Sequence, residues 1–158
     1  MYDIIIDSRE QLPLSFDCNT VCKYLKVGDY ACEYKGVLLK THFERKSPSD
    51  FFGTLVQGHN RFIRELERAK ALNIKLIVIV ECDYSTFVKK EFDGAEHSFL
   101  SPLVLTKILH TTMLNHNLEV VFCNGRKEMV LYIKNYFDAL KNKEIKRLKE
   151  EGVKPSSL

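Results

Sequence analysis

Apolar and polar positions alternate in the first third of the chain with the spacing of strands. Residues 27–34 and 37–44 favour two strands, and Lys35-Gly36 between them is typical of a tight turn. The sequence therefore predicts a β-hairpin that brings Asp29 and Glu44 toward each other. A short β-branched run over residues 4–6 predicts a further strand, which ends at Asp7.

The spacing then changes to that of helices. Ser47-Pro48 is typical of an N-cap followed by the first helical position. The helical pattern breaks near Gly58, resumes at Asn60 and continues to Asn73. Residues 75–81 are too continuously apolar for a half-exposed strand, which predicts a central strand buried on both faces.

The last part of the chain predicts two more helices and one strand. Residues 89–100 are polar and irregular, residues 101–115 form an expected helix, 118–123 a strand, and 125–140 an amphipathic helix. Strands alternating with helices predict the α/β class, with a central β-sheet flanked by helices.

Composition limits the domain count more than it limits function. The chain has 158 residues, of which 45% are hydrophobic and 28% charged, as expected for one globular domain. A net charge of +3 is only weak support for a nucleic-acid partner. After residue 140 the apolar pattern thins and five of the nine residues 141–149 are basic. We therefore expect a folded domain over 1–140 and a basic helical extension with a C-terminal tail over 141–158.

Cysteine usage and the N-terminus suggest a cytoplasmic protein. Five scattered cysteines without zinc-site spacing favour reduced thiols. The N-terminus has no basic n-region, and the longest apolar stretch, Leu76–Val80, is far shorter than a membrane span. We expect no export and no membrane partner.

The hairpin places candidate chemistry at one point. Hydrolysis of a phosphodiester needs an activated water and stabilisation of extra negative charge on phosphorus, and Mg²⁺ held by a few carboxylates supplies both. Alternation along a strand projects Glu44 and Lys46 to the same face, while Arg45 points away unless the strand ends there. An acid-x-Lys triplet is common, so the triplet by itself is weak evidence.

Three segments together carry a resemblance: residues 6–10 (Ile-Asp-Ser-Arg-Glu), 27–30 (Val-Gly-Asp-Tyr) and 44–50 (Glu-Arg-Lys-Ser-Pro-Ser-Asp). They are similar to the signature of the XPF/Hef-type structure-specific DNA endonucleases: Gly-Asp, a variable spacer, Glu-Arg-Lys, and an Asp four residues after the Lys. The resemblance covers roughly residues 3–140. It implies a restriction-endonuclease-like fold and Mg²⁺- or Mn²⁺-dependent cutting of branched or partly single-stranded DNA such as a flap, fork or junction. DNA repair, recombination or replication is the implied setting.

Site residues follow from this resemblance position by position. Asp29 and Glu44 correspond to metal ligands, Lys46 to the catalytic lysine, and Asp7 to an additional acid beside the metal. Arg45 corresponds to a residue that either faces the phosphate or orders the site.

The helix after the signature carries a basic stripe. Arg61, Arg64 and Arg68 are expected to follow a DNA backbone, although Glu65 and Glu67 could instead pair with them as a solvated face.

Several other positions stay divided between chemistry and structure. Asp50 belongs to the signature but also occupies a capping-box position. Arg9 is a candidate DNA contact, and both Arg9 and Glu10 are divided between support of the site and a surface ion pair. Glu81 could approach the site or be solvated, and His59 is a candidate phosphate contact.

The sequence departs from cellular XPF-type proteins after residue 140. The remaining 18 residues cannot hold a helix-hairpin-helix module, so we expect a stand-alone nuclease domain of phage or prokaryotic type, or one targeted by a partner. A homodimer through the last two helices is a further expectation, with Leu103, Ile108 and Leu109 as apolar contacts unless they belong to the core. Two alternatives are a non-catalytic DNA-binding or scaffold subunit, and a repair or restriction-type enzyme that recognises a sequence or lesion.

Overall fold

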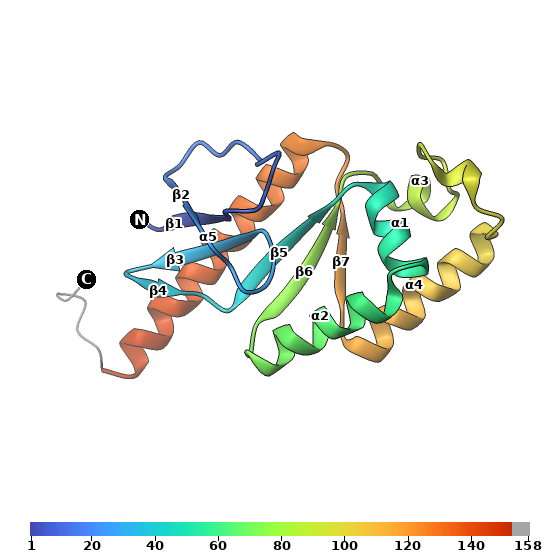
Figure 1. Cartoon of the computed structure of the whole chain (residues 1–158). Helices are drawn as coiled ribbons and strands as arrows, with labels where there is room; N and C mark the ends of the chain where they lie inside the picture. The colour runs from blue at the N-terminus through green and yellow to red at the C-terminus, as the bar shows by residue number, and fades with distance from the viewer. Residues whose placement is uncertain (153–158) are drawn as a thin grey trace.

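A seven-stranded mixed sheet forms the centre of the computed structural model, which describes residues 1–152 (Figure 1). The order of the paired strands is β2-β1-β3-β5-β6-β7, and β4 pairs with β3. β1 runs parallel to β2, β3 is antiparallel to both β1 and β5, and β5, β6 and β7 run parallel to one another. The strands are β1 (Asp3–Asp7), β2 (Thr20–Lys23), β3 (Tyr30–Tyr34), β4 (Val37–Leu38), β5 (Thr41–Lys46), β6 (Lys75–Val80) and β7 (Glu119–Phe122).

Helices cover the two faces of this sheet. Figure 1 shows α1 to α4 gathered on one side of β5, β6 and β7, and the long α5 on the other side. This arrangement confirms the predicted α/β class with a mixed sheet flanked by helices. The helices are α1 (Pro48–Val56), α2 (His59–Ala71), α3 (Tyr84–Val88), α4 (Pro102–His116) and α5 (Arg126–Glu150), with a short 3₁₀ turn, η1, at Ala95–His97.

The central strand β6 contributes to two cores. Val78 and Val80 pack with apolar side chains of α1, α2 and α4, whereas Ile77 and Ile79 pack with those of α5. All four side chains are fully buried, which confirms the prediction of a strand buried on both faces. Phe43 of the neighbouring β5 lies in the second core and makes edge contacts with three aromatic rings of α5.

The predicted hairpin is present with different strand limits. Lys35 and Gly36 both take positive φ, 53° and 75°, as in a tight two-residue turn. The first strand begins at Tyr30 and not at residue 27, because Gly28 adopts a φ of 79°, outside the extended region. The returning strand is split into β4 and β5, and β5 continues to Lys46.

Three features of the fold differ from the sequence prediction. The edge strand β2 was not predicted, because its side chains are mostly exposed and show no apolar alternation. The short helix α3 was also missed; Asp83 caps it by accepting a hydrogen bond of 2.7 Å from the Thr86 amide. Helix α5 does not end near residue 140 but runs on to Glu150.

The C-terminal extension is therefore part of α5 as far as the structure describes it. Ile145 and Leu148 are partly buried and pack against the second core. The expected tail at Pro155-Ser156-Ser157 lies outside the described residues. Within residues 1–152, none of the helices combines the length and apolar character that crossing a membrane requires.

Candidate active site

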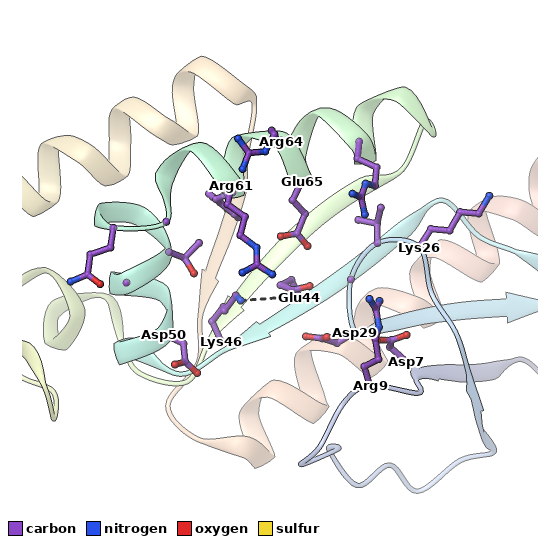
Figure 2. A pocket seen from close by; sticks show the side chains of 18 of the residues that line it. Asp7, Arg9, Lys26, Asp29, Glu44, Lys46, Asp50, Arg61, Arg64 and Glu65 are labelled. Atoms are coloured by element: carbon purple, nitrogen blue, oxygen red, sulfur yellow. Dashed lines mark hydrogen bonds and ion pairs between the residues drawn. The ribbon is translucent and has the colours of Figure 1, made fainter.

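A groove of about 1080 Å³ brings together segments that are far apart in the sequence. Its lining comes from the end of β1, the Gly28-Asp29 turn, β5 and the facing sides of α1 and α2 (Figure 2). Its charged members are Asp7, Arg9, Lys26, Asp29, Glu44, Lys46, Asp50, Arg61, Arg64, Glu65 and Arg68. Asp29, Glu44 and Lys46 lie on the floor of the groove, and the three arginines of α2 lie on one wall with Glu65 among them.

Asp29 is fixed on the floor by the backbone of β5. Its amide donates to the Phe43 carbonyl oxygen at 2.7 Å, and its Oδ2 accepts a hydrogen bond of 2.8 Å from the Arg45 amide. The turn before it lies close against β5: a Cβ on Gly28 would lie 3.0 Å from the Cβ of His42 and 3.1 Å from the Phe43 carbonyl oxygen. This close approach places Asp29 beside Glu44.

Glu44 and Lys46 project from one face of β5 into the groove, as predicted. The Lys46 Nζ lies 3.4 Å from the Glu44 Oε1, and their side chains are 23% and 13% exposed. In Figure 2 both side chains meet below α2, with Asp29 on the neighbouring turn. Asp29, Glu44 and Lys46, three predicted catalytic residues, thus share one partly desolvated space.

Burial makes both Asp29 and Glu44 weak acids. Desolvation, together with the charges of Asp29 and Glu65, raises the pKa of Glu44 to about 8 against the opposing effect of Lys46. Desolvation likewise raises the pKa of Asp29 to about 6, against the hydrogen bond from the Arg45 amide. Two adjacent carboxyl groups are difficult to ionise at the same time, because their negative charges repel each other. A bound cation stabilises the form in which both are ionised.

The donor chemistry of this pair suits Mg²⁺. This ion takes oxygen ligands, and proteins commonly supply only one or two carboxylates while water and substrate phosphates complete the shell. Asp29 and Glu44 provide that number. Within residues 1–152, no three His, Cys, Asp or Glu side chains lie close enough to hold a metal together. An all-protein metal cage is therefore absent from this part of the chain.

Asp7 lines the groove but both of its oxygens have partners. Oδ1 accepts a hydrogen bond of 2.8 Å from the Leu25 amide, and Oδ2 accepts one of 2.8 Å from the Arg9 Nε. The side chain is 3% exposed. These contacts orient Asp7 and Arg9, and the role of Asp7 as an additional acid beside the metal stays a prediction.

Arg45 does not line the groove. Its guanidinium pairs with Glu10 through two hydrogen bonds of 3.0 and 3.2 Å. The Tyr30 hydroxyl also lies 3.4 Å from Glu10. Of the two roles expected for Arg45, the structure favours ordering of the site over contact with a phosphate, and Glu10 is its partner.

The basic stripe of α2 faces the groove. Arg61, Arg64 and Arg68 all contribute to the lining, and Glu65 lies among them. Figure 2 shows Arg61 and Glu65 reaching from α2 toward Lys46 and Glu44. Glu67 lines a different groove, so it does not accompany the arginines at the site.

Comparison with known proteins identifies the family. The model of the ERCC4 domain family matches residues 6–136. The chain belongs to the ERCC4 domain family. This confirms the resemblance to XPF-type nuclease domains that residues 6–10, 27–30 and 44–50 carry. A search of curated proteins finds no match.

Solved structures share the fold of this ERCC4 domain. XPF from Aeropyrum pernix in complex with DNA matches with a TM-score of 0.62 and 21% identity, over 93% of this chain and 66% of that one. A second XPF structure from Aeropyrum pernix has a TM-score of 0.62 and 23% identity, over 86% of this chain and 65% of that one. The chain therefore spans slightly less than two thirds of the length of these structures.

Three positions that the sequence left open are now placed within the ERCC4 domain. Asp50 lines the groove from α1, while the helix is capped by the Ser47 Oγ, which accepts from the Asp50 amide at 3.1 Å. Glu81 follows β6 and does not contribute to the groove lining. His59 is also outside it, with its Nδ1 3.2 Å from the Leu55 carbonyl oxygen.

Lys26 is a groove residue that sequence reasoning missed. It is exposed and contributes to the lining beside the Gly28-Asp29 turn. Its place two residues before the Gly28-Asp29 pair was the only feature of the sequence that pointed to it. Exposed lysines are so common that this feature could not predict a groove residue.

Proposed function

We propose that this ERCC4 domain hydrolyses phosphodiester bonds in branched or partly single-stranded DNA, such as a flap, fork or junction, with Mg²⁺ or Mn²⁺ as cofactor. The observation that carries the proposal is the convergence of Asp29, Glu44 and Lys46 in a groove walled by the arginines of α2. Membership of the ERCC4 family and the likeness to a DNA-bound XPF support it. Repair, recombination or replication of DNA is the setting that such a substrate implies.

The acids and the lysine have separate tasks in this proposal. Asp29 and Glu44 would hold the divalent cation, which when bound stabilises charge developing on phosphorus and makes a water more acidic. Lys46 is held on the same face and directs its ammonium group into the groove, where it can donate to a phosphate oxygen or to the attacking water. The ion pair between Arg45 and Glu10 holds β5 in the position from which the Arg45 amide donates to the Asp29 carboxylate.

The walls of the groove would position the DNA backbone. Arg61, Arg64 and Arg68 line the groove from one side of α2, where their guanidinium groups can contact phosphates of the DNA backbone. Arg9 and Lys26 stand on the opposite wall. Such phosphate contacts position DNA without reading its sequence, consistent with recognition of DNA shape.

A panel of labelled substrates tests the proposal. A fork, a flap, a four-way junction and a plain duplex are incubated with Mg²⁺, with Mn²⁺ and with EDTA. We expect metal-dependent cutting of branched substrates in preference to the duplex. Binding without any cutting would support the non-catalytic scaffold alternative. Cutting confined to a sequence or lesion in plain duplex would support a restriction- or repair-type enzyme.

A further inference from the structure

An exposed arginine and an exposed tyrosine lie against each other at the rim of the groove. The Cζ of Arg9 lies 4.8 Å from the centroid of the Tyr24 ring, a cation–π distance. The Arg9 side chain is 61% exposed and Tyr24 is 63% exposed. Arg9 lines the groove, so this pair borders the space that Asp29 and Glu44 share.

Arg9 is held in a fixed plane although it is exposed. Its Nε donates to the buried Asp7 carboxylate at 2.8 Å, and its Nη2 donates to the Leu25 carbonyl oxygen at 2.8 Å. These two contacts, one of them to a buried carboxylate, fix the orientation of a guanidinium group that is otherwise exposed.

Tyr24 is also displayed by ordered neighbours. Lys23 before it ends β2 and pairs with Glu33 at 2.9 Å, while Leu25 after it is buried. The backbone at Tyr24 is thus fixed on both sides while its ring stays largely in solvent. The two planar groups form a surface on the rim, which we call the Arg9–Tyr24 platform.

We propose that the Arg9–Tyr24 platform stacks against an unpaired base of the DNA strand next to the cut, so that the site selects substrates with a single-stranded nucleotide at the branch. The inference rests on the proposed function and names the feature of the DNA that this groove recognises. In a duplex each base is stacked between its neighbours, and only an unpaired base can offer its face to a side chain.

The platform lies close enough to the acids to act on the same strand. The Asp7 amide donates to the Asp29 carbonyl oxygen at 2.8 Å, and the Asp7 carboxylate holds Arg9. Asp7 therefore links the platform directly to the residue proposed to bind metal. A strand whose phosphate lies over Asp29 and Glu44 can turn its next base outward onto this rim, while the arginines of α2 contact the opposite side.

The test compares Tyr24→Ala, Tyr24→Trp and the wild type, with Phe99→Ala as an exposed aromatic control outside the groove. Each protein is titrated in Ca²⁺ with a fork and with a plain duplex. The fork carries the fluorescent base aminopurine in its single-stranded arm beside the branch. Because stacking contributes about 1–3 kcal/mol per base, Tyr24→Ala should bind the fork about 5- to 150-fold more weakly. Tyr24→Ala should leave duplex binding unchanged and abolish the fluorescence quench. Tyr24→Trp should retain both the fork affinity and the quench of the wild type.

Other outcomes overturn the inference. Equal weakening on fork and duplex would mean that Tyr24 only supports Arg9, and a quench that persists in Tyr24→Ala would place the base elsewhere. Cleavage of the same fork with Mg²⁺ is followed in parallel. If the wild type cleaves the fork and Tyr24→Ala keeps the same preference for it, the role of the platform is refuted and the proposed catalysis stands. A Tyr24-dependent quench without wild-type cleavage refutes the proposed catalysis and leaves the platform standing.

Discussion

At the scale of single residues, Gly28 shows how tightly the site is built. Its φ of 79° is costly for any residue with a Cβ, and a Cβ there would also meet His42 and the Phe43 carbonyl oxygen. Gly36 has nearly the same φ, 75°, with no atom within 4 Å of an added Cβ. The two positions therefore separate backbone strain from crowding.

We predict that Gly28→Ala destabilises the protein more than Gly36→Ala does. The backbone strain costs about 1–2 kcal/mol in each variant. Crowding against β5 adds about 1–3 kcal/mol only at position 28. Urea denaturation of both variants measures the difference, and equal losses of unfolding free energy would show that the turn is not pressed against β5.

Glu44 gives a prediction on pH dependence. Its pKa is about 8 in the folded chain because of burial, and the ordinary value is 4.5. Between pH 4.5 and about pH 8 the Glu44 carboxyl stays protonated in the folded chain but loses its proton in the unfolded chain. The free energy of unfolding therefore falls as the pH rises from about 4.5 to about 8. Glu44→Gln removes the ionisation and its penalty.

In EDTA, Glu44→Gln should therefore be more stable than the wild type at pH 9 and nearly equal to it at pH 5. Unfolding free energies at the two pH values measure this, with Glu67→Gln, an exposed acid outside the groove, as the control. A difference between Glu44→Gln and the wild type that does not change with pH would contradict the burial of a weak acid at the site.

The roles of Asp7 and Arg45 mark the limit of reading residues from sequence. The convergence of Asp29, Glu44 and Lys46 in one groove could be predicted because a turn, a strand period and a signature agree on them. Asp7 has the same chemical type as Asp29, and only its contacts with Leu25 and Arg9 distinguish it. Such contacts depend on the parallel pairing of β1 with β2, an edge strand whose sequence shows no pattern.

At the scale of elements, α2 turns one helix face into a wall of the groove. Arg61, Arg64 and Arg68 recur three and four residues apart, so they lie on the face that meets the site. Lys70 belongs to the same helix but lines another groove. Lys70 can therefore serve as the control residue when the arginines of this helix are tested for contact with DNA.

We predict that Arg64→Ala weakens DNA binding on fork and duplex alike, because a phosphate contact carries no sequence or pairing information. The slope of log affinity against log salt should fall by about 0.9 for the lost contact. Lys70→Ala should change neither the affinity nor the slope. Fluorescence anisotropy over a salt series measures the affinity and the slope. Equal effects of Arg64→Ala and Lys70→Ala would refute the claim that only the groove-facing side of α2 contacts DNA.

Elements were predictable where local signals were redundant. The apolar run of β6 and the Ser47-Pro48 start of α1 each combine composition with a boundary residue. The end of α5 carried a local signal that the thinning apolar pattern obscured: no glycine or proline interrupts residues 126–150, and Gly152, with a φ of 76°, lies just beyond the end of the helix. The partial burial of Ile145 and Leu148 against the second core is a tertiary contact that the local pattern does not show.

At the scale of the whole molecule, the sheet separates two cores, and the groove opens at one face of it. The face carrying α1 and α2 supplies the wall of arginines, whereas α5 on the other face packs against Phe43 and supports β5 from behind. Residues 43 to 46 therefore alternate between support and site. A rigid strand between two cores holds Glu44 and Lys46 in one orientation.

The surface expected to dimerise is only partly available. Of the three apolar residues named for it, Leu109 is buried, Ile108 packs against the first core and Leu103 is 80% exposed. Only Leu103 remains free to contact a second copy. A homodimer through α4 and α5 stays a prediction, which sedimentation of the wild type and of Leu103→Glu can test.

The central claim is that Asp29 and Glu44 with a divalent cation, and Lys46 beside them, cut DNA. The most direct measurement is the single-turnover cleavage rate of a labelled fork with Mg²⁺ for the wild type, Asp29→Asn and Asp17→Asn, an exposed control outside the groove. Asparagine at position 29 keeps an oxygen that can accept from the Arg45 amide, so the fold should persist. We predict cleavage by the wild type and Asp17→Asn, fork binding without cleavage by Asp29→Asn, and no cleavage in EDTA. Undiminished cleavage by Asp29→Asn, or cleavage in EDTA, would contradict the account.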